Sequence, residues 1–268
     1  MSAKAADFSL AGRSIVVTGG GGILGTRMVG ALVAAGAQVA VIERELDKAS
    51  AACAGLEGLA GTAAPFAADI RNTASVEAAA WAIHAQFGPV HGLVNNAAVK
   101  SANFFEPFET FPLEDWKEVM DVNLNGAFVC AQIFGRDMAK RGVGAIVNTL
   151  SIYGVVAPDQ RIYEGSLYEG RAINTPAIYS ASKAGLWGLT MYLAGYWGSR
   201  NVRVNAITPG GVFSGQNDEF VARYSARIPL GRMADKDEMS GALVFLLSDA
   251  ASYVTGQNII VDGGLTVW

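Results

Sequence analysis

The stretch SIVVTGGGGILGTRMVGALVAAG, residues 14–36, decides the fold class. It joins a short β-branched run to an apolar segment of helical spacing through four consecutive glycines, Gly19 to Gly22. Glycine allows a tight turn and lets a ligand approach the backbone, and the N-terminus of the following helix favours a pyrophosphate group. A plain tight turn is the alternative. The position of the glycines between a strand and an apolar helix favours dinucleotide binding, with Gly25 letting the helix pack closely on the strand.

The same alternation of short and long segments continues along the chain. The expected strands are residues 14–18, 38–42, 64–69, 90–95, 145–150, 202–207 and 258–262. The segments with apolar residues at helical spacing are 23–35, 45–57, 73–87, 113–139, 176–199 and 236–248. Strands that are apolar on both faces are typical of parallel sheets covered by helices. We therefore expect an α/β fold, with one Rossmann-type domain over residues 1–268. Its seven-stranded sheet would be doubly wound and mostly parallel, with helices on both faces.

Composition narrows the classes of protein. The chain has 268 residues, of which 51% are apolar and 16% charged, so a sizeable core is expected. The net charge of −4, without a basic cluster, argues against binding to nucleic acid or to an anionic membrane. The first residues hold no apolar signal segment, and no uncharged run reaches the roughly 18 residues of a membrane span.

Cysteine and histidine usage adds two expectations. The two cysteines, Cys53 and Cys130, both fall in expected helices, which favours a disulfide-free protein in the reducing cytoplasm. The two histidines, His84 and His91, have no Cys or carboxylate at ligand spacing, so no metal site is expected.

An acidic residue ends the second expected strand. Glu43 lies about 20 residues beyond the glycines, where a carboxylate can accept hydrogen bonds from both ribose hydroxyls of adenosine. The same carboxylate would repel a 2′-phosphate, which favours NAD as the cofactor. Arg44 keeps NADP open as the alternative, because its guanidinium could pair with that phosphate.

Tyr179 and Lys183 lie four residues apart in an expected helix, and therefore on one face of it. An ammonium group near a phenol stabilises the phenolate and lowers the phenol pKa from its ordinary value of about 10. That would make Tyr179 an acid–base catalyst near neutral pH. On spacing alone, two unrelated residues on a helix surface are the alternative.

These motifs belong to a longer series. In chain order stand TGGGGILG (18–25), Glu43, AADI (67–70), NNAA (95–98), DVNL (121–124), IVNTLSIYG (146–154), YSASK (179–183), ITPGG (207–211) and TGQNIIVDGG (255–264). In this series the chain resembles the short-chain dehydrogenase/reductase family, from about residue 10 to the C-terminus.

The resemblance implies a role for each matching residue. Ser151 would hydrogen-bond the substrate oxygen, and Tyr179 would transfer its proton. Lys183 would bind the nicotinamide ribose and tune Tyr179, and Asn123 would hold a water that links Lys183 to solvent. The implied cofactor contacts are Gly19, Gly22, Ile23, Leu24, Gly25, Glu43, Arg44, Asp69, Ile70, Asn95, Ala97, Tyr179, Lys183, Pro209, Gly210, Val212 and Ser214. A homotetramer, paired through the YSASK helix and the helix before it, is implied as well.

Three features depart from the family pattern. Ile23 takes the place of the middle glycine of the turn, and Ala98 takes that of the usual glycine after NNA. The third is the long segment between Ser151 and Tyr179, whose two ends are tied to the active site. Long irregular loops in compact domains are usually functional or disordered. The aromatic and apolar residues of this segment favour an ordered substrate lid at about 157–176, with a neutral surface insertion as the alternative.

The substrate must be read from this insert and from the rim of the site. The polar residues of the insert are Asp159, Gln160, Arg161, Glu164, Glu169, Arg171 and Asn174. Candidate substrate contacts are Lys100, Tyr153, Arg161 and Arg171, and the two arginines could clamp a carboxylate or phosphate.

We therefore expect an NAD(P)-dependent oxidoreductase that interconverts a secondary alcohol and a ketone. The expected substrate is a sugar, a sugar acid or a related polyol. The alternatives are a biosynthetic reductase of a nonulosonic-type or nucleotide-linked sugar, and a catalytically silent nucleotide-sensing protein.

Overall fold

The computed structural model of the protein describes residues 7–168 and 170–268. Seven parallel strands form one sheet in the order β3-β2-β1-β4-β5-β8-β9. The strands are β1 (Ser14–Thr18), β2 (Gln38–Glu43), β3 (Thr62–Ala67), β4 (Val90–Asn95), β5 (Gly144–Thr149), β8 (Val202–Pro209) and β9 (Asn258–Val261). The predicted α/β fold with a seven-stranded parallel sheet is therefore confirmed.

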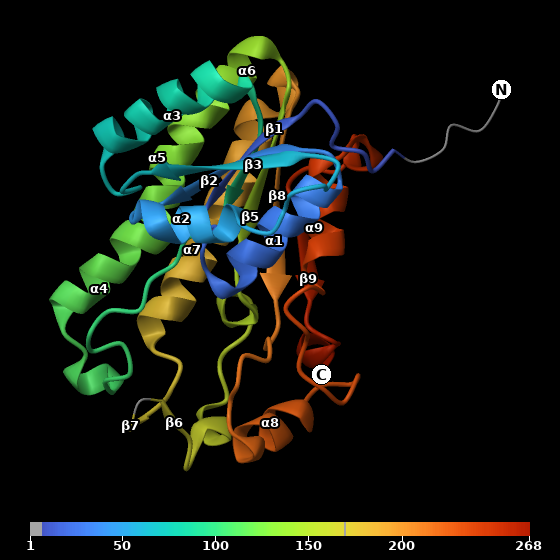
Figure 1. The fold of residues 1–268 in the computed structure, drawn as a ribbon. Coiled ribbons are helices and arrows are strands. Elements are labelled where there is room, and N and C mark those ends of the chain that lie inside the picture. Colours follow the sequence, from blue (N-terminus) through green and yellow to red (C-terminus); the bar gives the residue numbers. More distant parts are fainter. Residues whose placement is uncertain (1–6, 169) are drawn as a thin grey trace.

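Helices cover both faces of this sheet (Figure 1). The helices are α1 (Ile23–Ala34), α2 (Leu46–Cys53), α3 (Thr73–Phe87), α4 (Leu113–Met120), α5 (Ala127–Cys130), α6 (Arg136–Arg141), α7 (Ala177–Trp197), α8 (Asp218–Ser225) and α9 (Ser240–Leu247). α1, α2 and α9 pack on one face, and α3, α5, α6 and α7 pack on the other. Successive strand residues alternate between the faces, so Val16 packs with the second group and Val17 with the first.

The strand order reverses beside β1, which lies between β2 and β4. At the carboxyl end of β1, Thr18 pairs with Ile42 on one side and with Asn95 on the other. In doubly wound sheets, ligands bind at such a reversal, beyond the carboxyl ends of the strands. The glycine turn that follows Thr18 begins at that point.

Three helices differ from the prediction. The helix expected over 113–139 continues to Arg141, and it widens to π-helical turns over Asp121–Gly126 and Ala131–Gly135, between α4, α5 and α6. α2 ends at Cys53, earlier than expected, since Gly55 follows with a positive φ of 75°. α8 was not predicted, and its first turn is capped by the Asn217 side chain, which accepts the Phe220 N–H at 2.8 Å.

The insert between β5 and α7 is folded. It forms a 3₁₀ turn over Gln160–Tyr163 and a hairpin of β6 (Leu167–Tyr168) and β7 (Arg171–Ala172). Figure 1 shows the hairpin and α8 below the carboxyl ends of the sheet strands. Glu169, one of the polar residues singled out in the insert, lies outside the described residues.

Packing and hydrogen bonds hold the insert in place. Ile162 is buried in an apolar cluster with Phe220 and Tyr224 of α8. Gln160 and Thr175 bind each other reciprocally, because Gln160 Nε2 donates to the Thr175 carbonyl oxygen at 2.8 Å and the Thr175 N–H donates to Gln160 Oε1 at 3.2 Å. The insert is thus fastened to α8 and closed on itself at its base. Over the part of the chain that the structure describes, none of the helices has both the length and the apolar character to cross a membrane.

Candidate active site

The glycine turn between β1 and α1 leaves no room for side chains. Gly19 has a φ of 65°, and a Cβ there would lie 2.6 Å from the Cα of Ala97. A Cβ on Gly25 would overlap the carbonyl oxygen of Gly19. α1 begins at Ile23 without a side-chain cap, so its first N–H groups can face an anionic ligand. Ile23 itself is 56% exposed and has no positive φ, so the turn forms without a glycine there.

A cavity of about 360 Å³ opens beside this turn. The predicted cofactor contacts that line it are Gly19, Gly22, Ile23, Leu24, Gly25, Glu43, Arg44, Asp69, Ile70 and Ala97. Glu43 ends β2, and its Oε1 accepts the backbone N–H of Gly21 at 2.9 Å. Arg44 is exposed, with Nη2 3.5 Å from Oε1 of Glu45. The cavity therefore combines helix N–H donors at one end with a carboxylate at the other.

Two of the predicted contacts have partners within the chain. The Arg71 guanidinium hydrogen-bonds Asp69, at 2.6 Å from Oδ2, and this bond holds the pKa of the Asp69 carboxyl below its ordinary value. Asn95 does not line the cavity, because its Nδ2 donates to Asn148 Oδ1 at 2.8 Å inside the sheet. The cofactor contact expected of Asn95 therefore stays a prediction. Neighbouring residues of a strand face opposite ways, and it is Asn96 that lines the cavity and donates to the Gly19 carbonyl oxygen at 3.0 Å.

Three of the predicted catalytic residues meet near the carboxyl end of β5. Ser151 follows β5, while Tyr179 and Lys183 lie one turn apart on α7. Ser151 hydrogen-bonds the Tyr179 phenol. Lys183 is 3% exposed, and its Nζ donates to the Thr149 carbonyl oxygen at 2.7 Å. The same Nζ lies 6.0 Å from the centre of the Tyr179 ring.

Asn123 lies in the first π-helical stretch and is fixed at both ends of its amide. Its Oδ1 accepts the Val99 N–H at 3.0 Å, and its Nδ2 donates to Ser182 Oγ at 3.2 Å. Ser182 in turn donates from Oγ to the Tyr179 carbonyl oxygen at 3.0 Å. These bonds connect the helix that carries Asn123 to the first turn of α7, where Tyr179 lies.

A second cavity, of about 720 Å³, holds Ser151 and Tyr179 in its wall. The other predicted contacts that line it are Lys100, Tyr153, Gly210, Val212 and Ser214. Pro209 closes β8 and is followed by the lining residue Gly210 without lining the cavity itself. Phe104 and Phe105 form part of an aromatic wall, and the Phe104 ring meets the Tyr179 ring edge-on with centres 6.3 Å apart.

The two arginines of the insert do not line this cavity. The Arg161 side chain is 82% exposed and binds Asp159 through Nε and Nη2, both at 2.8 Å. Arg171 is exposed, and its Nη1 donates to the Ala102 carbonyl oxygen at 3.1 Å. Both guanidinium groups therefore have partners within the chain, and the anion clamp stays a prediction.

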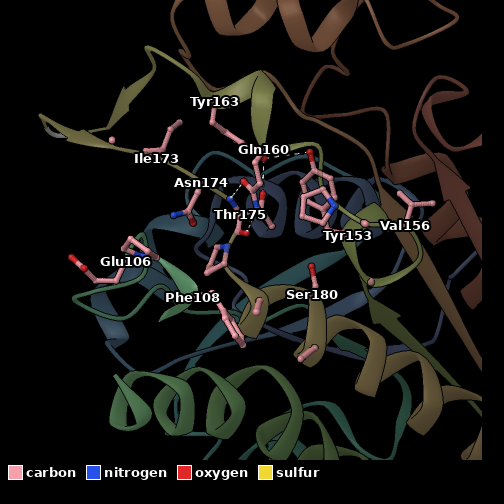
Figure 2. Close-up of a pocket in the computed structure, with 18 of the residues that line it drawn as sticks. Glu106, Phe108, Tyr153, Val156, Gln160, Tyr163, Ile173, Asn174, Thr175 and Ser180 are labelled. Carbon is pink, nitrogen blue, oxygen red and sulfur yellow. Dashed lines mark hydrogen bonds between the residues drawn. The ribbon is translucent and has the colours of Figure 1, made fainter. Parts of the chain in front are cut away.

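Tyr163 connects the insert to the active-site wall (Figure 2). Its hydroxyl lies 2.6 Å from Thr175 Oγ1 and donates to the Tyr153 hydroxyl at 3.3 Å. Tyr153 and Tyr163 line both the second cavity and a further hollow of about 950 Å³ behind the insert. These hydroxyl groups therefore form a hydrogen-bonded partition between the two spaces.

Comparison with known proteins gives the family. Residues 22–266 match the family model described as Enoyl-(Acyl carrier protein) reductase. D-threitol dehydrogenase of Mycolicibacterium smegmatis is 36% identical, over 97% of this chain and 95% of that protein. The chain belongs to the short-chain dehydrogenase/reductase family.

Solved structures of similar dehydrogenases contain both forms of the cofactor. Gluconate 5-dehydrogenase of Burkholderia cenocepacia, in complex with NADP and tartrate, matches with a TM-score of 0.85 at 32% identity, over 98% of each chain. A short-chain dehydrogenase of Leptospira borgpetersenii with bound NAD⁺ matches with a TM-score of 0.85 at 33% identity, over 99% of this chain and 97% of that one. This short-chain dehydrogenase/reductase is therefore an NAD(P)-dependent oxidoreductase, as the sequence predicted.

The residues of this dehydrogenase fit a nicotinamide dinucleotide. The uncapped start of α1 faces the first cavity, where any Cβ at Gly19 would collide with Ala97. Glu43 supplies a carboxylate in the same cavity. When bound, the nicotinamide supplies the hydride acceptor or donor, so the chain itself must handle the proton at the substrate oxygen.

The pKa of Tyr179 differs from the sequence-based expectation. Burial raises the pKa of its phenol; the hydrogen bond with Ser151 acts in the opposite direction, and the nearby Tyr163 raises the pKa further. Burial also lowers the pKa of Lys183 to about 8. The expected lowering of the Tyr179 pKa by Lys183 is not found, because the Lys183 ammonium is itself desolvated and bonds Thr149. The dehydrogenase thus holds Tyr179 as a neutral phenol, which is the form that donates a proton to a ketone.

Sequence reasoning missed several residues that line the cavities of this dehydrogenase. Asn96 is the second Asn of NNAA and directly follows Asn95, the residue that was predicted to contact the cofactor. Gln216, whose Oε1 accepts the Ser214 N–H at 2.7 Å, belongs to no motif. Tyr224 lines the second cavity from α8, a helix that was not predicted. Over residues 7–168 and 170–268, no group of three or more His, Cys, Asp or Glu side chains is arranged to hold a metal ion.

Proposed function

We propose that this dehydrogenase interconverts a secondary alcohol and a ketone on a polyol or sugar. The observation that carries the proposal is the make-up of the second cavity, in which Ser151 and Tyr179 face neutral hydroxyl and amide groups of the insert and of the segment before α8. Its volume of about 720 Å³ suits a small-molecule site. The names of the D-threitol and gluconate dehydrogenases point to the same class of substrate.

In the direction of alcohol oxidation, Tyr179 must first lose its own proton, and the phenolate then takes the proton of the reacting hydroxyl. Ser151 holds the substrate oxygen beside Tyr179, with which it shares a hydrogen bond. Lys183 would hold the nicotinamide ribose of the bound cofactor, and Asn123 would anchor a water that links Lys183 to solvent. In the direction of ketone reduction, the neutral phenol returns the proton, which agrees with the raised pKa of Tyr179.

The proposal extends to the insert and to the assembly. Residues 157–176 act as a substrate lid that is already packed on α8 through Ile162. The protein is a homotetramer in the cytoplasm, with α7 and the helix before it at one interface. This is supported by the exposed aromatic residues Tyr192 and Tyr196 on α7, whose rings stack with centres 5.7 Å apart, and by the free cysteines Cys53 and Cys130.

A substrate panel tests the proposed function. Purified protein is incubated with NAD or NADP and with polyols, aldoses, sugar acids and simple secondary alcohols, and the appearance of the reduced cofactor is followed by absorbance. We expect turnover with polyols or sugars at a kcat/KM well above that of secondary alcohols without further hydroxyls. Turnover of simple alcohols alone, or of none of the hydroxylated compounds in the panel, would contradict the proposed function.

A further inference from the structure

Two polar atoms of the insert have no hydrogen-bond partner among residues 7–168 and 170–268. They are Oγ of Ser166 and Oδ1 of Asn174, and both atoms are buried. Ser166 as a whole is 2% exposed. Burying a polar group without a partner lowers the stability of the fold, and folded proteins pair most of their buried polar groups. Two such groups close together in one short segment therefore need a reason other than stability.

The hairpin of the insert brings these two residues together. Ser166 directly precedes β6, and Asn174 follows β7 after Ile173. The Ile173 N–H donates to the Ser166 carbonyl oxygen at 3.4 Å, which joins the two strands at the base of the hairpin. Both residues line the cavity of about 720 Å³ that holds Ser151 and Tyr179. The two residues thus belong to the wall of the cavity that also holds the predicted reacting residues.

The remaining bonds of the two residues determine what they offer a ligand. Asn174 donates from Nδ2 to the Phe105 carbonyl oxygen at 2.7 Å, so the amide is oriented and Oδ1 remains as an acceptor. Figure 2 shows Asn174 on the insert between Ile173 and Thr175. The Ser166 backbone N–H donates to the Tyr163 carbonyl oxygen at 2.9 Å, and its hydroxyl remains able to donate and accept. An alcohol hydroxyl can donate to the Asn174 amide oxygen, and it can donate to or accept from the Ser166 hydroxyl. The two groups therefore match the hydrogen-bonding capacity of an alcohol.

We propose that Ser166 and Asn174 form a recognition pair for the substrate hydroxyl groups beyond the carbinol that reacts at Tyr179. This inference rests on the proposed polyol function and deepens it. A neutral amide oxygen and a neutral hydroxyl bind a neutral hydroxylated chain end. Among the described residues that line the cavity, a charged side chain comes from Lys100, which lies 5.3 Å from the centre of the Phe105 ring. The pair therefore selects substrates by their distal hydroxyl groups.

Ser166→Ala is the cleanest test, because the hydroxyl that it removes has no partner in the part of the chain that the structure describes. Ser14→Ala is the matched control: Ser14 is 0% exposed, its Oγ is likewise unpaired, and it opens β1 at the opposite end of the sheet from the active site. kcat/KM is measured with D-threitol or galactitol, which carry further hydroxyls beyond the reacting carbinol, and with butan-2-ol, which carries none. Thermal melting is recorded for each variant.

We expect Ser166→Ala to lower kcat/KM for the longer polyols about threefold to tenfold, the worth of one hydrogen bond, mainly through KM. Its activity on butan-2-ol and its melting temperature should not fall. Ser14→Ala should leave both substrates unchanged. Asn174→Ala should show the same substrate selectivity, although its melting temperature falls because the bond to Phe105 is lost.

An equal loss on both substrates, or no loss on either, would overturn the recognition pair. Both results leave the proposed function intact, because the wild-type protein would still oxidise polyols. If the wild-type protein oxidises no polyol, the proposed function fails first and the recognition pair falls with it.

Discussion

Gly21 donates its backbone N–H to Oε1 of Glu43 over 2.9 Å, so the glycine turn and the end of β2 hold each other. A Cβ on Gly21 would lie 3.1 Å from the same oxygen and 2.9 Å from the carbonyl oxygen of Lys48. Glycine at this position therefore allows the carboxylate to approach the turn. This fixes a negative charge at the end of the cofactor cavity, while Arg44 remains exposed beside Glu45.

The first prediction concerns the choice between NAD and NADP. The wild-type protein should bind NAD more tightly than NADP, because the Glu43 carboxylate repels a 2′-phosphate. Glu43→Gln keeps an acceptor for the Gly21 N–H and removes the charge, so it should gain affinity for NADP and lose little for NAD. Glu43→Ala removes both and should weaken NAD as well. Titration of each variant with both cofactors separates the effect of the Glu43 charge from that of its hydrogen bond. Tighter binding of NADP by the wild type would indicate that Arg44, and not Glu43, determines the choice of cofactor.

Tyr179→Phe should reduce turnover by about 10²-fold or more, the usual scale of general acid–base catalysis. The affinity for NAD should remain nearly the same, since the phenyl ring keeps its contact with Phe104. Tyr163→Phe is the matched control, because it also removes a phenol hydroxyl from the cavity wall but leaves the proton donor in place. If Tyr179→Phe retains near wild-type turnover, Tyr179 is not the proton donor.

Lys183→Met should stabilise the cofactor-free protein while abolishing its activity. The pKa of Lys183 is about 8 in the folded protein and has an ordinary value of 10.5, so the unfolded chain binds more protons between these values. Burying the ammonium therefore costs stability below pH 8, and this cost fades as the pH rises towards 10.5. Between pH 7 and pH 9.5, the free energy of unfolding of the wild type should rise by about 2 kcal/mol relative to that of the variant.

Urea unfolding of both proteins at several pH values measures this effect. The variant also loses the bond to the Thr149 carbonyl oxygen, but that loss does not depend on pH. A stability difference that stays constant from pH 7 to 9.5 would show that Lys183 keeps an ordinary pKa in the folded protein.

The two arginines of the insert should not select anionic substrates. Arg161→Ala should change kcat/KM by less than about twofold for sugar acids and polyols alike, since the side chain is exposed and pairs with Asp159. Arg171→Ala loses its bond to the Ala102 carbonyl oxygen and should lower activity on both substrate classes equally. A selective loss on sugar acids would return the arginines to the substrate site.

Light scattering at micromolar concentration should give the mass of a tetramer. A paired substitution, Tyr192→Asp with Tyr196→Asp, places charge on the exposed face of α7 and should split the assembly. Leu46→Asp is the control, because Leu46 is 49% exposed on α2, which packs on the opposite face of the sheet from α7. A monomeric wild-type protein, or equal effects from both sets of substitutions, would contradict an interface on α7.

The sequence patterns located the seven sheet strands because each is a short run rich in apolar residues, and the resemblance to the family supplied the predicted catalytic residues. Asn95 shows the limit of this reasoning. A motif places a residue at the end of a strand, but the face on which its side chain lies changes with every position. The structure turns Asn95 towards Asn148 and brings Asn96 to the cavity.

Other features depend on contacts that no local pattern encodes. Arg161 turns away from the cavity because Asp159, two residues earlier, binds its guanidinium. α8 has only eight residues and a mixed composition, and it gains its place by packing Phe220 and Tyr224 against Ile162 of the insert. The raised pKa of Tyr179 follows from its burial, which the spacing to Lys183 could not reveal.

The insert lies between Ser151 and Tyr179 in the sequence, so the chain enters and leaves it close to the two residues that we propose hold the reacting oxygen. For protein engineering, this makes residues 157–176 a natural cassette. A graft of this segment between homologous enzymes should keep the reciprocal hydrogen bonds of Gln160 and Thr175 and an apolar residue at position 162. These are the contacts that hold the segment in place. Changes within residues 157–176 can likewise alter substrate choice during evolution, while the segments before and after the insert are conserved by a separate selection for hydride transfer.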